Sequence, residues 1–383
     1  CNGVGACRKI GSGVMCPSFM ATRNEKDSTR ARANALRLAI SGQLNAGDTK
    51  AAVSSDQLQD VMGLCLSCKA CKKECPNAVD VAKMKSEVLQ ARYDEKGTPL
   101  GVRIVGDLPG LAHWLTGPWA PIVNKVNNLG FVRGQLEKIA GIDHRRPLPA
   151  FAKQSLKSIL GDCQTKGTPD RGEVALYIDS YTNAYEPHIG LAALNLLADC
   201  GYRVTPLFVG DSQRARISKG LLDLAKRDGE KVMRKIDKQI PADMPILCLE
   251  PSCASSLADD LPDLIDDEEL GKRIAPRIFM VDEFLHKEGV KVTPKYKKLI
   301  IHGHCHQKSV FGIEGLRRLL PRAKVIDAGC CGMAGSFGYE HRDLSLKIGE
   351  DRLFPAIRRR PEGTEVVANG FSCRHQVAEA CGI

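Results

Sequence analysis

Residues 65–76 read CLSCKACKKECP, so that Cys65, Cys68, Cys71 and Cys75 follow the spacing C-x2-C-x2-C-x3-C-P. This spacing is typical of segments that bind an iron–sulfur cubane, in which each of four irons takes one thiolate. The short gaps let a tight loop direct three sulfurs inward, and the lysines between the cysteines offset the negative charge of a cluster. Structural zinc is the alternative, but zinc sites usually carry two well-separated cysteine pairs. The stretch therefore predicts a 4Fe–4S cluster in a small N-terminal domain.

A second Cys-Pro pair, Cys16-Pro17, precedes this motif. In ferredoxins with two clusters, the cysteine before the proline binds the other cluster rather than the one bound by its own motif. We therefore expect Cys16 to complete the ligand set of Cys65, Cys68 and Cys71.

The last cysteine of the motif, Cys75, would then join Cys1 and Cys7 at a second site. The opening stretch departs from the regular spacing, because Val4 occupies the middle position where a third cysteine is expected. Three thiolates do not fill a cubane. Three alternatives remain open: no second cluster, a ligand other than cysteine, or a cysteine that precedes residue 1.

The composition is that of a globular protein with two to three domains. The chain has 383 residues, of which 43% are hydrophobic and 26% charged, with a net charge of +10 and only 5% aromatic residues. These values do not favour a nucleic-acid binder. No run of eighteen apolar residues occurs, so no transmembrane helix is expected. The chain begins at Cys1 without Met, and we expect it to be a piece of a longer polypeptide.

The 16 cysteines indicate the cellular compartment. They are clustered, no signal peptide precedes them, and a chain of this length does not need disulfides to compensate for a small core. Clustered cysteines in a reducing compartment more often bind metal. We therefore expect a cytoplasmic protein, with peripheral contact to the inner face of the membrane as an alternative.

From residue 172 onward, short β-rich runs alternate with helical stretches, which favours an α/β architecture with parallel strands. The fold class predicted for the whole chain is α+β and α/β, with a helical ferredoxin-like cluster domain followed by a duplicated α/β domain. The predicted divisions are a cluster domain at 1–97, a helical and Pro-rich connector at 98–171, a first repeat at 172–262 and a second repeat at 263–383.

An internal duplication is the reason for placing two repeats in this region. Residues 246–253 (ILCLEPSC) match residues 366–373 (VVANGFSC), each a short apolar run ending in Ser-Cys. A second match places Tyr181 opposite Cys305. A repeat distance of this size suggests two related domains that face each other rather than a solenoid.

The two repeats differ in their cysteines. The second contains Cys305, Cys330, Cys331 and Cys373, whereas the first retains only Cys253. Each of these cysteines follows a predicted strand, where the loops of a parallel sheet converge on ligands. We expect a metal or redox site in the second repeat, either an iron–sulfur cluster or a redox dithiol.

Three histidines flank Cys305 in the segment HGHCHQK. Alternation along a strand would direct His304 and His306 to one face. These two residues are candidate proton donors at the site, and the alternative is a structural role as hydrogen-bonded histidines at a strand end.

The connector contains both tryptophans, Trp114 and Trp119, in an apolar segment broken by Pro and Gly. We expect helices that pack on their neighbours, because no basic amphipathic face accompanies the tryptophans. The alternative is a surface that contacts a membrane or a quinone-linked partner.

These motifs resemble known families. Cys305, Cys330-Cys331-Gly332 and Ser372-Cys373 look like the cysteine-rich CCG domain of heterodisulfide reductases, of the glycolate oxidase iron–sulfur subunit and of the anaerobic glycerol-3-phosphate dehydrogenase small subunit. The opening CNGVGACRK, with MCPSFMATRNEKDSTRARANALR after it, resembles the segment that joins the two halves of fused bacterial D-2-hydroxyacid dehydrogenases. That resemblance implies FAD on a preceding oxidase part, which oxidises D-lactate, D-2-hydroxyglutarate or glycolate.

The resemblance implies an oxidoreductase component that passes electrons from the flavin to a quinone or another carrier. Its cofactors would be one to three 4Fe–4S clusters, with the FAD-linked oxidase part as partner. One departure matters: Gln376 stands where the heterodisulfide reductases have a further cysteine, so their noncubane cluster is not expected. The other functions considered are a thiol–disulfide reductase and a zinc-stabilised binding module.

Overall fold

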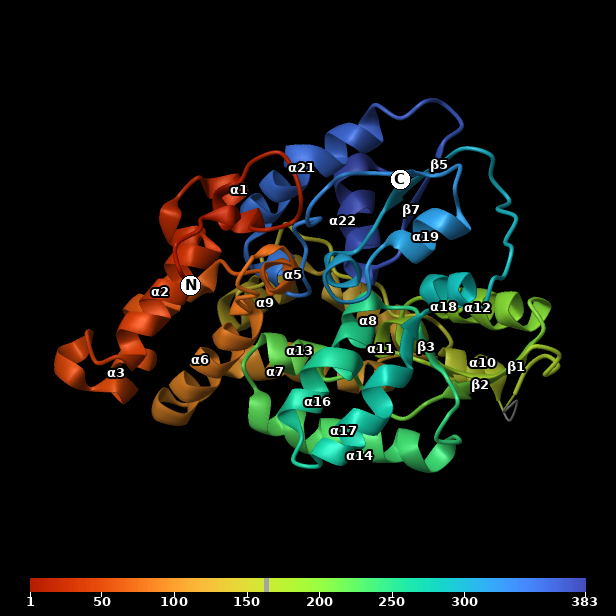
Figure 1. The fold of residues 1–383 in the computed structure, drawn as a ribbon, viewed down its shortest axis with the longest axis horizontal. Helices are drawn as coiled ribbons and strands as arrows, with labels where there is room; N and C mark the ends of the chain where they lie inside the picture. Colours follow the sequence, from red (N-terminus) through yellow and green to blue (C-terminus); the bar gives the residue numbers. More distant parts are fainter. Residues whose placement is uncertain (162–164) are drawn as a thin grey trace.

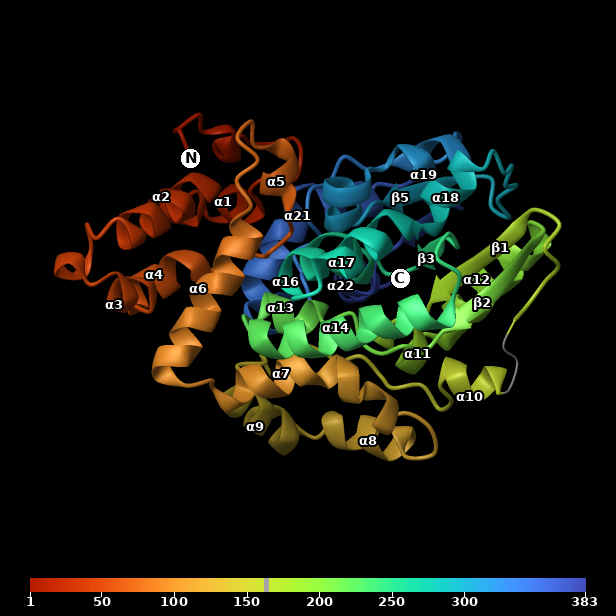
Figure 2. The same cartoon turned by 60° about the horizontal axis from the view of Figure 1, so that its bottom comes forward.

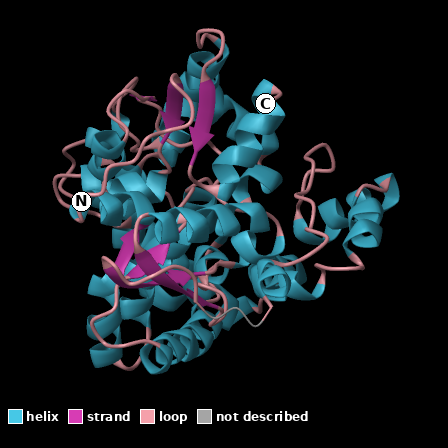
Figure 3. Cartoon of the chain, turned by 90° about the vertical axis from the view of Figure 1, so that its right-hand side faces the viewer, coloured by secondary structure: helices cyan, strands magenta, loops and turns pink. Residues whose placement is uncertain are grey.

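The computed structural model describes residues 1–161 and 165–383. Helices predominate, and the strands form two separate parallel sheets (Figures 1 and 3). At this level the structure confirms the predicted mixture of helices and parallel sheet. The cysteine-rich N-terminal region lies at one side of the molecule, against the C-terminal part of the chain (Figure 1).

The N-terminal region is built from helices, most of which begin with a side-chain cap. The hydroxyl of Ser28 accepts the N–H of Ala31 at the start of α2, and the Asp80 carboxylate accepts those of Ala82 and Lys83 at the start of α6. Its helices are α1 (Pro17–Thr22), α2 (Thr29–Ile40), α3 (Thr49–Val53), α4 (Asp56–Gly63), α5 (Ala70–Glu74) and α6 (Val81–Lys96).

The predicted connector forms a group of helices along one edge of the molecule (Figure 2). Both tryptophans are largely exposed, Trp114 at 72% and Trp119 at 67%, as is Phe131 at 78%. In the described part of the chain, none of the helices combines the length and apolar character that a membrane crossing requires. The helices are α7 (Leu100–Leu111), α8 (Ala120–Asn127) and α9 (Gly130–Ala140), followed by α10 (Leu156–Leu160).

The first sheet has the strand order β2-β1-β3-β4, with all neighbours parallel. Its strands are β1 (Gly172–Tyr177), β2 (Tyr202–Leu207), β3 (Ile246–Cys248) and β4 (Ile278–Met280). The predicted first repeat ends at residue 262, whereas β4 pairs with β3 and extends this sheet to residue 280. The helices of this part are α11 (Ser180–Ala184), α12 (Pro187–Asp199), α13 (Arg214–Ser218), α14 (Leu222–Gln239), α15 (Pro251–Ser255), α16 (Leu261–Leu264), α17 (Glu268–Ile274) and α18 (Val281–Lys287).

The second sheet has the order β6-β5-β7 and is also parallel. Its strands are β5 (Leu299–His302), β6 (Lys324–Val325) and β7 (Glu365–Ala368). A π-helical turn, η7 (Gln307–Phe311), follows β5 and contacts α5 of the N-terminal region. The helices of this part are α19 (Glu314–Leu319), α20 (Phe337–Glu340), α21 (Arg342–Arg358) and α22 (Phe371–Cys381).

Candidate metal centres

Four cysteines surround one small cavity in the N-terminal region. Cys65, Cys68 and Cys71 belong to the ferredoxin-type motif, and Cys16 comes from the segment before α1. Apolar residues such as Val81 line the same cavity. The arrangement is the donor set that a 4Fe–4S cluster requires, four thiols in a largely water-excluded site.

Backbone conformation shapes the loop around this cavity. Ser67 and Lys69 adopt left-handed conformations, with φ of 51° and 59°. Two such residues in close succession turn the chain sharply between the cysteines. Lys69 then caps the start of α5, whose first turn carries Cys71.

The carboxylate of Glu74 holds the Cys16 segment beside the motif. Its Oε1 accepts the N–H of Val14 at 2.7 Å, and its Oε2 accepts the N–H of Met15 at 3.2 Å. Lys9 also pairs with this carboxylate. The motif thus supplies both three thiols and the group that fixes the position of the fourth.

A buried arginine lies against the Cys16 thiol. Arg32 is 1% exposed, and its Nη1 lies 3.4 Å from the Cys16 Sγ, while Nη2 donates to Ser18 Oγ at 3.0 Å. Burial alone would raise the pKa of Cys16, but the positive charge of Arg32 and the Ser18 hydroxyl lower it. By contrast, burial and the Cys65 thiolate raise the pKa of Cys71 to about 12. The site therefore concentrates negative charge, and Arg32 partly compensates for it.

The cysteines of the proposed second cluster lie in the segments that flank this cavity. Cys7 is buried and accepts the N–H of Arg30 at 3.3 Å, whereas Cys1 is exposed. The side chain of Asn77 donates to Asn2 at 2.6 Å, which joins the chain after Cys75 to the N-terminal segment. No ligand set is completed there by the described residues.

Cys305 and Cys330 adjoin the N-terminal cavity. Both pack in one buried cluster with Cys16, Cys68 and Cys71. Burial raises the pKa of Cys68 well above its ordinary value, and the nearby Cys305 thiolate adds to this effect. A hydrogen bond from Cys330 holds the pKa of Cys305 well below its ordinary value. The thiols of the second sheet region therefore lie close enough to the ferredoxin-type site for Cys305 to shift the pKa of Cys68.

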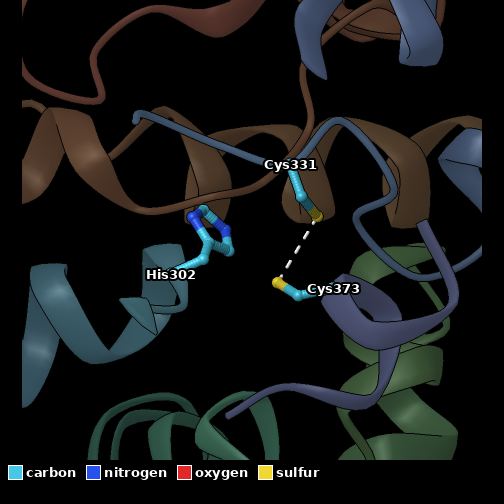
Figure 4. A group of neighbouring side chains, drawn as sticks. All are labelled: His302, Cys331 and Cys373. Carbon is cyan, nitrogen blue, oxygen red and sulfur yellow. Dashed lines mark hydrogen bonds between the residues drawn. The ribbon is translucent and has the colours of Figure 1, made fainter. Parts of the chain in front are cut away.

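Cys331 and Cys373 lie on the other side, in the core of the second sheet region. The Cys373 thiol donates to the Cys331 sulfur at 3.4 Å, and His302 at the end of β5 completes a group of three (Figure 4). Hydrogen bonds from Cys330 and Cys373 lower the pKa of Cys331 well below its ordinary value. The Cys330 thiol therefore lies between the two groups, since it bonds both to Cys305, beside the ferredoxin-type site, and to Cys331.

Cys253, a candidate ligand from the sequence, lies apart from these groups. It is buried in the core of the first sheet, where the Ser212 hydroxyl donates to its sulfur at 3.0 Å. Burial raises its pKa well above the ordinary value. This is the environment of a structural thiol.

His304 and His306 lie beyond the end of β5, so the strand alternation used to pair them does not apply. They are nevertheless neighbours, with ring centroids 5.3 Å apart, and both line one cavity. His306 donates from Nε2 to the carbonyl oxygen of Ser67 at 3.0 Å, and its backbone N–H donates to His304 Nδ1 at 3.1 Å. Burial opposes a positive charge on His304, but the Cys305 thiolate outweighs it and raises the pKa of His304 to about 9.

This cavity of about 170 Å³ is the meeting point of all parts of the chain. Its wall is largely apolar and aromatic, and the rings of Tyr181 and Phe371 stack with centroids 4.6 Å apart. The ferredoxin-type loop contributes Leu66 and Ser67. Helix α7, the loop with His304 and His306, and Cys305 itself supply further parts of the wall. Such a cavity fits a small, flat ligand beside the thiol groups.

Ion pairs fasten the N-terminal region to the first sheet region. The ammonium of Lys69 is fully buried and lies 2.6 Å from Asp259 and 2.7 Å from Asp260. Lys72 pairs with Asp259, and Lys83 pairs with Asp263. The lysines expected to offset cluster charge therefore also make contacts between regions.

Comparison with known proteins assigns a class to the N-terminal region. Residues 1–80 match the family described as a 4Fe-4S dicluster domain. This match confirms the predicted 4Fe–4S cofactor and the ferredoxin-type nature of the region. No solved structure is significantly similar to the chain.

The particular relatives are dehydrogenases. The whole chain is 24% identical to D-2-hydroxyglutarate dehydrogenase of Pantoea ananatis and 24% identical to that of Escherichia coli, and spans about 42% of the length of each. Over 68% of its length it is 25% identical to one subunit of the anaerobic glycerol-3-phosphate dehydrogenase of Escherichia coli, and the alignment covers 68% of that subunit. These comparisons confirm the predicted resemblance and agree with an oxidoreductase component.

The sequence interpretation missed His302 as a site residue and Glu74 as the anchor of the Cys16 segment. The sequence could have indicated His302, because it lies in the same HGHCHQK segment as the two candidates His304 and His306. It could not have indicated Glu74, because its partners Val14 and Met15 are sixty residues away in the chain.

Proposed function

We propose that this chain is the iron–sulfur electron-transfer module of an FAD-linked D-2-hydroxyacid dehydrogenase. The observation that carries the proposal is the buried cavity surrounded by Cys16, Cys65, Cys68 and Cys71. A 4Fe–4S cluster held there supplies one-electron transfer. The chain's own residues bind it through four thiolates, exclude water and balance its charge with Arg32.

A second cluster is proposed at Cys1, Cys7 and Cys75, because the matched family is a dicluster domain. The Asn2–Asn77 contact supports this, since it brings the two segments that carry these cysteines together. The fourth ligand of this second cluster is then a residue other than Cys1, Cys7 and Cys75.

We also propose that the two sheets are a duplicated CCG-type domain. Their strand orders support this: β2-β1-β3 and β6-β5-β7 both place the first strand of the region between the second and the third. Cys253 and Cys373 both lie in the first turns of the helices that follow the third strands. The first copy retains this one cysteine at the matched positions, so the second copy, through Cys305 beside the ferredoxin-type site, is the one that takes part in electron transfer.

The electrons leave to a quinone or another carrier that binds in the cavity between the regions. Proximity supports this step, because Cys305 and Ser67 line the cavity and both adjoin the ferredoxin-type site. Of the two candidate histidines, His304 is the proposed proton donor, because its ring lines the cavity and its pKa is raised to about 9. His306 instead gives its Nε2 proton to the Ser67 carbonyl and holds the loop in place. Helix α7 lines the cavity through Val105, Leu108 and Pro109. The exposed apolar residues of α7 and α8 are the proposed contact with the FAD-linked part or with a membrane surface.

The alternative functions lack equivalent support. A thiol–disulfide reductase would use the Cys330-Cys331 pair directly, but both thiols are buried and bond to further cysteines. A binding module held by zinc alone would not require four cysteines around the N-terminal cavity together with a match to a 4Fe–4S family.

The test compares Cys16→Ser and Cys68→Ser with Cys200→Ser, which changes a cysteine outside both clusters. Protein purified without oxygen is reduced with dithionite and examined by electron paramagnetic resonance (EPR). Both site variants are expected to lose the signal of the same 4Fe–4S cluster, while Cys200→Ser retains it. Retention of that signal in Cys16→Ser would refute the proposed ligand set.

A further inference from the structure

His302 is a buried side chain that has no oxygen or nitrogen partner among the described residues, and its polar neighbour is the Cys331 thiol. The residue is 0% exposed, and in the described part of the chain neither ring nitrogen has a hydrogen bond to oxygen or nitrogen. Leaving a polar group unpaired in a protein interior costs about 1–3 kcal/mol. A histidine retained at such a position is most simply explained by a ligand that occupies one of its nitrogens.

Two thiol sulfurs lie close to the His302 ring. Cys331 and Cys373 have their sulfurs 3.4 Å apart, and one ring nitrogen and both sulfurs lie within 4.8 Å of one another. Figure 4 shows the three side chains, carried by separate elements, around one space. His302 ends β5, Cys331 lies in the loop after β6, and Cys373 lies in the first turn of α22.

These distances match one metal ion better than a cluster. With Zn–S of about 2.3 Å and Zn–N of about 2.0 Å, the ligand atoms of a tetrahedral zinc site lie about 3.5–3.8 Å apart. A cubane spreads its thiolates farther, because each sulfur binds a different iron. The 3.4 Å between the Cys331 and Cys373 sulfurs is therefore too short for two corners of a cubane and close to the edge of a tetrahedron.

This group lies in a core of its own, and the Cys330 thiol, which bonds to those of Cys331 and Cys305, connects it to the ferredoxin-type side. Cys331 and Cys373 lie in a core with Ile300 and Met333, whereas Cys330 packs with the N-terminal cysteines. A mixed nitrogen and sulfur ligand set in a dry interior favours Zn²⁺ among the common metals.

We propose that His302, Cys331 and Cys373 bind a single Zn²⁺ ion, with Cys330 or a water molecule at the fourth position. The ion would tie the end of β5, the loop after β6 and the start of α22 together, so its role is structural. The inference goes beyond the proposed function, because it requires no electron to pass through this site.

The experiment measures zinc and iron per chain by elemental mass spectrometry on protein purified without oxygen. The variants are His302→Gln and Cys373→Ser, with Cys200→Ser as the matched control. We expect about one zinc in the wild type and in Cys200→Ser, at least a tenfold loss of zinc in both site variants, and unchanged iron in all four proteins. Absence of zinc from the wild type, unchanged zinc in His302→Gln, or a loss of iron instead of zinc would overturn the proposal.

X-ray absorption at the zinc edge of the wild-type protein tests the site even if the variants do not fold. The expected spectrum contains sulfur at about 2.3 Å and nitrogen at about 2.0 Å, in a ratio of two or three to one. A zinc environment of oxygen and nitrogen alone would contradict the assignment. The iron content and the cluster EPR signal report on the proposed electron transfer independently, so failure of one proposal is distinguishable from failure of the other.

Discussion

The Nε2 atom of His306 donates a hydrogen bond to the carbonyl oxygen of Ser67 at 3.0 Å, across 239 residues of sequence. Ser67 lies between two cysteines of the ferredoxin-type motif, and His306 follows Cys305. Beside this bond, the Ser309 hydroxyl lies 3.3 Å from the carbonyl oxygen of Cys68. Together they fix the cluster-binding loop against the second sheet region, where the cavity for an electron carrier lies.

Replacing His306 tests this link. His306→Ala leaves the Ser67 carbonyl unpaired in a buried position, so we expect a loss of about 1–3 kcal/mol in the free energy of unfolding. His306→Gln keeps a donor near the position of Nε2 and is expected to recover part of that loss. Chemical denaturation of the cluster-loaded protein measures both. Equal stabilities of the alanine variant and the wild type would show that the bond contributes nothing.

Arg32 is expected to tune the reduction potential of the cluster. Reduction adds negative charge, and the buried guanidinium beside Cys16 stabilises it. Arg32→Met should therefore shift the midpoint potential of one cluster to a more negative value, as measured by EPR-monitored redox titration. Arg37→Met, on an exposed position of the same helix, is the control and should leave the potential unchanged. A shift to more positive potential in Arg32→Met would contradict the electrostatic argument.

Glu74 is expected to control the retention of iron. Glu74→Ala removes two hydrogen bonds from a carboxylate to the backbone before Cys16. Bonds to charged groups contribute about 1.5–3 kcal/mol each, so the loss of iron to a chelator should be at least about tenfold faster. Glu87→Ala changes an exposed glutamate and should release iron at the wild-type rate. An unchanged rate in Glu74→Ala would mean that Cys16 is held by other contacts.

The raised pKa of Asp179 leads us to expect that the stability of the fold depends on pH. Burial raises the pKa of Asp179 from 3.8 to about 6, and the charge of Glu250 adds to the effect. A carboxyl with a raised pKa in the folded state stabilises the fold most below its unfolded pKa. That contribution falls as the pH rises from about 4 to about 6, by up to about 3 kcal/mol.

Asp179→Asn removes this titration and keeps an oxygen that accepts the N–H of Tyr181 and of Thr182 at the start of α11. The unfolding free energy of the wild type, measured relative to this variant, is therefore expected to decrease between pH 4 and pH 6 and to level off above. A difference that is constant across this range would show that the carboxyl titrates normally.

Local sequence patterns predicted much of the fold. Ser28 precedes α2 and Gly97 follows α6, and both are residue types whose placement indicates a helix end, because caps satisfy the free backbone groups of a helix terminus. The apolar runs before Ser-Cys marked β3 and β7. Strand β4 was missed because it has three residues and no distinct periodicity, and its place depends on pairing with β3.

The candidate sites, too, were predicted from local patterns but not where they depend on contacts between distant parts of the chain. The spacing of Cys65, Cys68 and Cys71 predicted their grouping, and Cys16 follows from the Cys-Pro pattern. The approach of Cys305 to this group could not be predicted, because it depends on contacts between regions that are distant in sequence. The position of Cys330 between Cys305 and Cys331 has the same origin, since the loop after β6 is positioned by packing on both sides.

The content of iron and acid-labile sulfide per chain, with EPR after dithionite reduction, shows whether this chain holds iron–sulfur clusters for electron transfer. We expect at least about four irons and four sulfides in wild-type protein purified without oxygen, and about eight of each if the second cluster is present. The reduced protein should give the EPR signal of a 4Fe–4S cluster. A chain that contains zinc but no iron, or iron without labile sulfide, would contradict the account.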